Sequence, residues 1–230
     1  MSLELRGISF SHPGANLDSG RLLDGLSLRV AAGEIVGLGA PSGAGKSTLL
    51  RIAALMTPAN AGSVIIHEQE YGPGSPVPRH IRRSLGVVLQ SPRAAADPRL
   101  RLGALICAPL SFRDGSLRPR PQRYERELAE LAEWVQLDPA LLWRYPHQVS
   151  DGQLQRAMLA RALALEPDVL ICDEPTAQLD PGTTSSIMGL LADRAASGAA
   201  VLIASHDGAA LSTVAHTMLE LAQINHPNPD

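Results

Sequence analysis

The residues with the clearest chemical potential lie within residues 39–48, which read GAPSGAGKST. An apolar run precedes them and a helical pattern follows, so the segment has the order strand, glycine-rich turn, helix. Glycines in such a turn let successive backbone N–H groups point at the phosphates of a nucleotide. Lys46 can then reach the β- and γ-phosphate oxygens, and the Ser47 hydroxyl can bind Mg²⁺. The segment therefore predicts a phosphate-binding loop, and the residues expected to contact the nucleotide are Pro41, Ser42, Gly43, Ala44, Gly45, Lys46, Ser47 and Thr48.

The use of basic residues supports this interpretation over a glycine-rich turn that matches by chance. Nineteen of the twenty basic residues are arginine, and the only lysine is Lys46. A phosphate-binding loop needs a compact ammonium group rather than a planar guanidinium, so the single lysine lies where arginine is a poor substitute. The strict pattern G-x-x-x-x-G-K-[ST] has glycine where this chain has Ala40. We therefore expect a negative φ at Ala40.

A pair of carboxylates, Asp173 and Glu174, follows the wholly apolar residues 169–172. Such a run is typical of a central parallel strand, and an open α/β sheet binds its ligand at the carboxyl ends of its strands. Adjacent residues of an extended chain point to opposite sides, so the two carboxylates could divide the work. We predict that Asp173 holds the hydration shell of Mg²⁺ and that Glu174 orients or deprotonates an attacking water.

The elements that position these groups follow from the hydrophobic pattern. Antiparallel strands are expected near the N-terminus, and alternating strands and helices after Ser150 predict a parallel sheet. Ser150 and Asp180 are predicted N-caps of two helices, and Gly198 is expected to end the second. The helix after the phosphate loop is predicted from the spacing of its apolar residues, and it should stop before Pro58. Its apolar face is Leu49, Ile52, Ala53 and Met56, and the predicted strands are residues 3–10, 26–30, 62–67, 85–90, 169–172 and 201–204.

Residues 91–149 have a different character, because strand patterns disappear there. Loops rich in arginine and proline flank one helical pattern, whose apolar face is Leu128, Leu131, Ala132 and Val135. We predict one domain over residues 1–230: a RecA-like core with an antiparallel β subdomain in residues 1–90 and 166–230, and an inserted α-helical subdomain in residues 91–165. The fold class is α/β, a P-loop NTPase with a mostly parallel core sheet.

The composition narrows the class of protein. At 230 residues and 45% hydrophobic content, the chain can bury a large core, and a net charge of −3 argues against a nucleic-acid partner. Eleven arginines lie within residues 79–126, which form either a solvated face or a surface that docks on something acidic or near lipid headgroups. Cys107 and Cys172 lack metal-binding spacing and are predicted to be buried free thiols. Without a leader pattern or a long apolar run, we expect a cytoplasmic chain.

Together with residues 150–153 (SDGQ), Gln90, Asp180 and His206, the motifs resemble those of the nucleotide-binding subunit of an ABC transporter over essentially the full chain. The resemblance implies ATP and Mg²⁺ as ligands, with Gln90 touching both Mg²⁺ and a membrane partner. It implies that His206 contacts the γ-phosphate and that Asp180 lies at a dimer interface. Ser150, Gly152 and Gln153 would form the signature motif, which closes on the γ-phosphate of the opposite subunit. The catalytic set would be Lys46, Gln90, Glu174 and His206, the metal set Ser47, Gln90 and Asp173, and His12 would occupy the adenine-stacking position.

A narrower resemblance is to the ATPases of dipeptide, oligopeptide and nickel importers. It is carried by residues 90–93, 97–99, 103, 108–110, 152–156 and 159–163. It implies integral-membrane permease subunits as partners, a second ATPase subunit that is either different or identical, and indirect work with an extracytoplasmic substrate-binding protein. The chain would then lie at the inner face of the cell membrane. The resemblance does not decide whether the transported substrate is a peptide or nickel or a metal chelate. The alternative is a non-transport ATPase in a soluble complex of the carbon–phosphorus lyase type, whereas a DNA-repair protein, a translation factor, a P-loop kinase and a GTPase fit the motifs less well.

Asp151 departs from the family pattern, which has glycine at this position. Its carboxylate would lie near a polyanion and should weaken the ATP site that it completes unless it points away. We therefore expect an asymmetric pair of ATPases in which this chain completes the weaker site.

Overall fold

The molecule consists of two sheets and the helices that pack on them. The computed structural model describes residues 2–12, 21–41, 43–177 and 179–225. The N-terminal sheet is antiparallel, with the strand order β2-β1-β4-β5. Where β4 pairs with β1, Gly62 has a φ of 86°, and a Cβ atom there would lie 2.4 Å from the carbonyl oxygen of Gly7, so the close approach requires glycine. The strands of this sheet are β1 (Leu3–Phe10), β2 (Leu23–Val30), β4 (Ala61–Ile66) and β5 (Gln69–Tyr71).

The second sheet is parallel throughout its described pairings and has the order β6-β7-β8-β3-β9. Its central strands β7 and β8 are buried along their whole length, which explains why their sequences are continuous apolar runs. The predicted parallel sheet is therefore confirmed. Its strands are β3 (Ile35–Gly39), β6 (Leu85–Val88), β7 (Val169–Asp173), β8 (Ala200–Ala204) and β9 (Thr217–Glu220).

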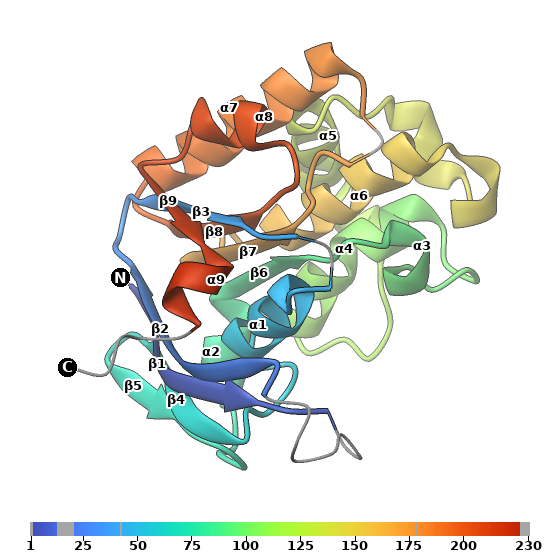
Figure 1. Cartoon of the computed structure of the whole chain (residues 1–230). Helices are drawn as coiled ribbons and strands as arrows, with labels where there is room; N and C mark the ends of the chain where they lie inside the picture. The colour runs from blue at the N-terminus through green and yellow to red at the C-terminus, as the bar shows by residue number, and fades with distance from the viewer. Residues whose placement is uncertain (1, 13–20, 42, 178, 226–230) are drawn as a thin grey trace.

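Alternate residues of the parallel sheet face two different cores. Val169 and Ile171 of β7 pack with α1 and the antiparallel sheet, whereas Leu170 and Cys172 pack with the helices of the other side. Figure 1 shows this layering, with α1 and the antiparallel sheet below the parallel sheet and α7 and α8 above it. The helices of the core are α1 (Lys46–Ala53), α2 (Arg79–Arg83), α7 (Pro181–Ala196), α8 (Gly208–Ser212) and α9 (Leu221–Ile224).

A helical insert projects from one end of the parallel sheet, on the right of Figure 1. Its centre is the contact between α4 and α6, and α5 packs on both. Short 3₁₀ turns over Pro121–Arg123, Pro139–Trp143 and Pro146–Gln148 connect the helices. The helices are α3 (Pro92–Ala95), α4 (Leu102–Arg113), α5 (Glu125–Trp134) and α6 (Asp151–Leu163).

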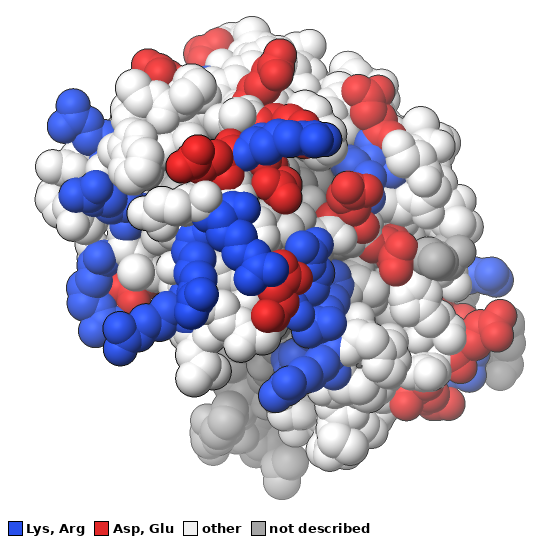
Figure 2. All heavy atoms as spheres, turned by 180° about the vertical axis from the view of Figure 1, so that it is seen from behind, with Lys and Arg blue, Asp and Glu red and all other residues white. Residues whose placement is uncertain are grey.

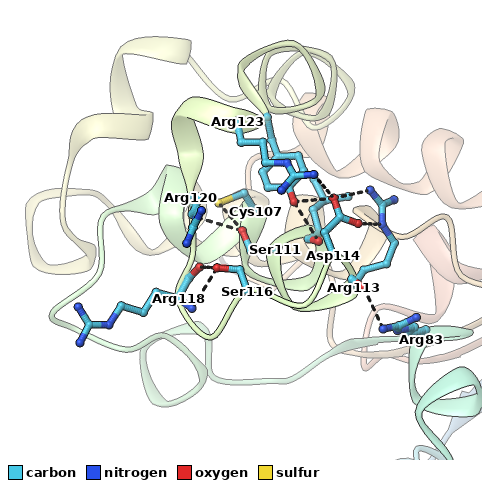
Figure 3. Close-up of polar contacts among 11 residues, drawn as sticks. Arg83, Cys107, Ser111, Arg113, Asp114, Ser116, Arg118, Arg120 and Arg123 are labelled. Atoms are coloured by element: carbon cyan, nitrogen blue, oxygen red, sulfur yellow. Dashed lines mark hydrogen bonds and ion pairs between the residues drawn. The ribbon is translucent and has the colours of Figure 1, made fainter.

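The chain leaves α4 through a turn held by polar contacts, drawn in Figure 3. The Asp114 carboxylate accepts a hydrogen bond from the Tyr124 hydroxyl at 2.8 Å and pairs with Arg113 at 2.8 Å and Arg123 at 3.5 Å. These partners, Arg113 first, lower the pKa of Asp114 to about 2. The Ser111 hydroxyl accepts the backbone N–H of Arg120 at 3.0 Å, which closes the turn.

Several details differ from the sequence predictions. The helix after the phosphate loop ends at Ala53, so Met56 does not lie on its face and is 53% exposed. Helix α4 occupies residues for which the sequence predicts a loop. The helix is apolar on nearly all sides and contains Pro109, so its sequence shows no helical period. The short strands β5 and β9 were not predicted. Both cysteines are buried free thiols, as expected.

The arginine-rich region lies on the surface and is mixed with carboxylates. In Figure 2, basic side chains gather over one part of the rear face with acidic side chains between them. Arg99 and Arg126 form ion pairs with Asp97 and Glu130, at 2.8 and 2.9 Å. Within the described ranges, no helix is long and apolar enough to cross a membrane.

Candidate active site

An open cavity of about 920 Å³ lies at the carboxyl ends of β3, β7 and β8. This is the edge at which parallel sheets bind ligands, and the volume is within the range of small-molecule sites. Most predicted residues meet here: the cavity is lined by His12, Pro41, Gly43, Gly45, Lys46, Ser47, Thr48, Gln90, Asp173, Glu174 and His206. Ala44 lies in the same loop without lining the cavity, and Ser42 lies outside the described residues.

The phosphate loop has the backbone that its glycines predict. Gly43 and Gly45 have φ values of 80° and 100°, in the left-handed region that favours glycine. Ala40 is not among the described residues with positive φ, which explains how alanine replaces the glycine of the strict pattern. The Lys46 ammonium donates to the carbonyl oxygens of Ala40 and of Pro41, the latter at 3.3 Å, so it folds over its own loop.

Asp173 is the last residue of β7 and is only 5% exposed. Burial raises the pKa of its carboxyl, while a hydrogen bond with the Ser47 side chain acts in the opposite direction. A buried carboxylate touching a hydroxyl at the mouth of a phosphate loop fits Mg²⁺, which prefers oxygen ligands and keeps several waters. Gln90 lines the same cavity and can supply an amide oxygen.

Glu174 has an unusual backbone, with a φ of 52° just after the strand ends. The expectation that Asp173 and Glu174 point to opposite sides is wrong, because this turn is not extended and both residues line the cavity. The Glu174 carboxylate is almost fully buried; its Oε2 lies 2.7 Å from His206 Nδ1 and accepts the Ser205 hydroxyl at 3.3 Å. A strained residue held by several partners is characteristic of functional sites.

Helix α6 supports this turn from the side away from the cavity. Gln155 is 2% exposed, and its amide nitrogen donates to the carbonyl oxygens of Glu174 at 3.3 Å and Pro175 at 3.2 Å. The Glu174 N–H donates in turn to Ala204 of β8 at 2.9 Å. The backbone of Glu174 is therefore held by two elements that are far apart in the sequence.

His12 lines the cavity, and its ring meets Phe10 edge-on with centroids 5.3 Å apart. Phe10 is 8% exposed and belongs to the core of the antiparallel sheet, so His12 is the ring that an adenine could reach.

The remaining predicted residues lie outside this cavity. Ser150 caps α6 in a capping box: its hydroxyl accepts the Gln153 N–H at 3.2 Å, and the Gln153 side chain accepts the Ser150 N–H at 2.9 Å. Asp180 caps α7 through two hydrogen bonds from Thr183. Gly152 follows in the first turn of α6. None of the four lines the cavity around Lys46.

Sequence reasoning assigned no role in the site to three residues that support it. Ser205 and Gln155 act on Glu174 as described above, and Arg93 contacts the loop before α6. Ser205 directly precedes the predicted His206, which was the available signal. The contacts of Gln155 and Arg93 span 19 to 56 residues, so no local pattern announces them.

Comparison with known families matches residues 23–177 to the family described as ABC transporter. A candidate peptide import ATP-binding protein of Brucella abortus (strain 2308) is 38% identical over 204 residues, which is 87% of this chain and 60% of that protein. The Fe(3+) ions import ATP-binding protein FbpC 1 of Rhodococcus jostii (strain RHA1) is 36% identical over 207 residues, 90% of this chain and 55% of that protein. The chain thus spans at most 60% of the length of these relatives.

A solved structure gives the same result for the fold. A dimeric post-hydrolysis state of the ATP-binding cassette MJ0796, bound to ADP and Pi, has a TM-score of 0.83 and 26% identity and covers 95% of this chain and 93% of its own. The antiparallel N-terminal sheet, the parallel core sheet and the helical insert are therefore those of an ATP-binding cassette.

Proposed function

Since this chain belongs to the ABC transporter family, we propose that it is an ATPase subunit that hydrolyses MgATP in a head-to-tail dimer and drives a membrane importer. The observation that carries the proposal is the cavity in which Lys46, Asp173 and Glu174 meet at the carboxyl edge of the parallel sheet. A phosphate-binding lysine, a metal-binding carboxylate and a candidate base surround one space large enough for a nucleotide.

The proposed roles follow from the position of each group. The N–H groups of residues 43–47 and the Lys46 ammonium bind the phosphates, with Lys46 exchanging its loop carbonyls for phosphate oxygens. His12 stacks on adenine. Ser47, Asp173 and Gln90 would hold Mg²⁺, which neutralises charge on the β- and γ-phosphate oxygens when bound.

Glu174 is the proposed base. Its carboxylate orients a water for attack on the γ-phosphorus and accepts a proton from it, while the bond from that phosphorus to the ADP oxygen breaks. His206 lies 2.7 Å from Glu174 and is highly exposed, so it can hold the carboxylate or turn toward the γ-phosphate.

A second ATPase subunit would complete the site. Ser150, Gly152 and Gln153 lie at the start of α6 but outside the Lys46 cavity, so they are free to face the γ-phosphate bound by a partner. Asp180 would lie at the same dimer interface. We propose pairing with a different ATPase as the first choice and self-pairing as the second.

For the cargo, we propose a peptide or a nickel or metal chelate, received from an extracytoplasmic binding protein by permease subunits on which this chain docks at the inner membrane face. The peptide-import relative supports the first class. The iron-import relative, at 36% identity, keeps metal cargo open.

The test is affinity purification of the chain from detergent-solubilised membranes of its host, with mass spectrometry of the proteins recovered. The wild-type chain and a Glu174→Gln variant are compared, each with and without MgATP. Two polytopic permease subunits and a second ATPase are the expected companions. Recovery of soluble partners alone would refute transport and favour a soluble complex of the carbon–phosphorus lyase type, and absence of ATP hydrolysis by every preparation would refute the ATPase itself.

A further inference from the structure

Asp151 places a negative charge at the first position of α6, between Ser150 and Gly152. In the proposed dimer this turn faces the γ-phosphate of the partner's ATP, and a carboxylate there repels the ligand unless its charge is balanced. An acidic residue in the first turn also favours the helix itself, so Asp151 is acceptable to α6 and unfavourable only toward an anion.

Arg93 lies opposite, at the second position of α3 and three residues after Gln90. Two nitrogens of its guanidinium contact the turn that precedes α6, and the third contacts the first residue of α6. Nε lies 2.5 Å from Asp151 Oδ1, while Nη1 donates to the Pro146 carbonyl at 3.1 Å and Nη2 to the Val149 carbonyl at 3.2 Å. One side chain thus joins two carbonyl groups of the turn to the start of α6.

The Arg93 guanidinium balances the negative charge of the Asp151 carboxylate. Oδ1 is shielded from water, and among the described residues it has no hydrogen-bond partner apart from this ion pair. The two side chains remain 47% and 42% exposed, so the pair lies at the surface that the proposed dimer would cover. Covering it with a second subunit would strengthen the electrostatic interactions of both charges.

We propose that Arg93 is a positioning residue that neutralises Asp151 and holds the turn before α6 in the shape needed to bind the partner's γ-phosphate. It also ties the segment after Gln90 to the signature motif, which links the metal-binding region of one ATP site to the residues that complete the other. This inference rests on the proposed function, because it needs a phosphate opposite Ser150.

A purely structural role for Arg93 would have different consequences. If Arg93 only fastened the carbonyls of Pro146 and Val149, its loss would loosen the turn whatever residue stands at position 151. If its charge matters, removing the carboxylate at Asp151 must relieve the defect. The decisive quantity is therefore the coupling between the two substitutions rather than the effect of either alone.

The experiment is steady-state ATP hydrolysis by the full chain, with its second ATPase subunit where one is needed, over a range of MgATP and salt concentrations. The variants are Arg93→Ala, Arg93→Lys, Asp151→Asn and the double variant Arg93→Ala/Asp151→Asn. Arg126→Ala, which removes an exposed ion pair with Glu130, is the matched control. Nucleotide affinity of the dilute monomer is measured in parallel.

Arg93→Ala is expected to raise the KM for MgATP about tenfold with a smaller change in kcat, because an uncompensated charge opposes binding across the interface. The defect should shrink with salt, and Arg93→Lys should restore part of it. The double variant should return to within about threefold of wild type. Monomer affinity should not change, since neither residue lines the Lys46 cavity.

A double variant as impaired as Arg93→Ala, at every salt concentration, would overturn the inference while leaving the ATPase intact. If Arg93→Ala does not fold, Arg93→Gln keeps the side-chain stem without the charge, and the same comparison applies. A wild-type chain that hydrolyses no ATP with any partner would instead refute the proposed function, and the inference with it.

Discussion

Glu174 combines a left-handed backbone with a buried carboxylate held by His206 and Ser205. We expect Glu174→Gln to keep ATP binding and to reduce hydrolysis by about a hundredfold or more, because an amide cannot accept the proton of the attacking water. Phosphate release and equilibrium binding of a fluorescent ATP analogue measure the two properties. Glu70→Gln, at an exposed position of β5, is the control. Unchanged turnover would exclude Glu174 as the base.

The Asp173 carboxyl is buried, and burial disfavours its charged form. Burial raises its pKa in the folded protein, so the folded state binds its proton more tightly than the unfolded chain does. Stability is therefore lost as the pH rises through the window between the two pKa values.

We expect Asp173→Asn to raise the melting temperature of the nucleotide-free protein at pH 7, with a gain that disappears when the pH falls below the carboxyl pKa. The same variant should lose its response to Mg²⁺ in nucleotide binding. Thermal unfolding with EDTA between pH 4 and 8 measures the effect. A gain that is independent of pH would contradict this electrostatic account.

At the scale of elements, α6 connects the proposed signature motif at its start to the backbone of Glu174 through Gln155. We expect Gln155→Leu, which keeps the volume of the side chain but removes the donor, to lower kcat about tenfold, because a small displacement of a catalytic group has large effects. The KM should change little. Turnover is compared with that of Gln122→Leu, an exposed residue of a 3₁₀ turn. Equal kcat values for the two variants would contradict the role of Gln155.

The turn after α4 provides an electrostatic test of the helical insert. Asp114 is charged in the folded state down to a pH of about 2, because Arg113, Tyr124 and Arg123 favour its carboxylate. Its contribution to stability is present above its ordinary pKa of 3.8 and is lost as the pH falls toward 2. We expect Asp114→Asn to have a lower melting temperature than wild type at pH 7 and the same one near pH 2. A constant difference would indicate lost packing instead.

The sequence predicts those helices and strands whose signal lies within a few neighbouring residues. Capping residues and apolar periods identified α6 and α7, and continuous apolar runs identified β7 and β8. Helix α4 was not predicted, because the 3.6-residue periodicity is absent when nearly every face of a helix is buried, and because Pro109 indicates a helix break. The strained turn at Glu174 and the reach of Arg93 depend on tertiary contacts, which local spacing does not encode.

For the molecule as a whole, the cavity and the start of α6 are separate surfaces. In the proposed dimer, each would be one incomplete half of a nucleotide site. A second subunit would complete both halves, and a head-to-tail pair would close two sites at once. Association of the subunits is the property to measure, because hydrolysis alone does not show which subunit supplies Ser150.

With its second ATPase subunit present where one is needed, we expect Glu174→Gln to form a dimer when MgATP is added, and Glu174→Gln/Ser150→Asp to stay monomeric with unchanged ATP affinity. Aspartate keeps the N-cap acceptor of α6, so the helix stays capped while a negative charge faces the partner's phosphate. Glu174→Gln/Ser150→Asn, which caps without charge, should still dimerise. Light scattering after size exclusion gives the mass, and fluorescent ATP gives the affinity. Dimerisation of the aspartate variant, or loss of its ATP affinity, would place Ser150 outside the interface or inside its own chain's nucleotide site.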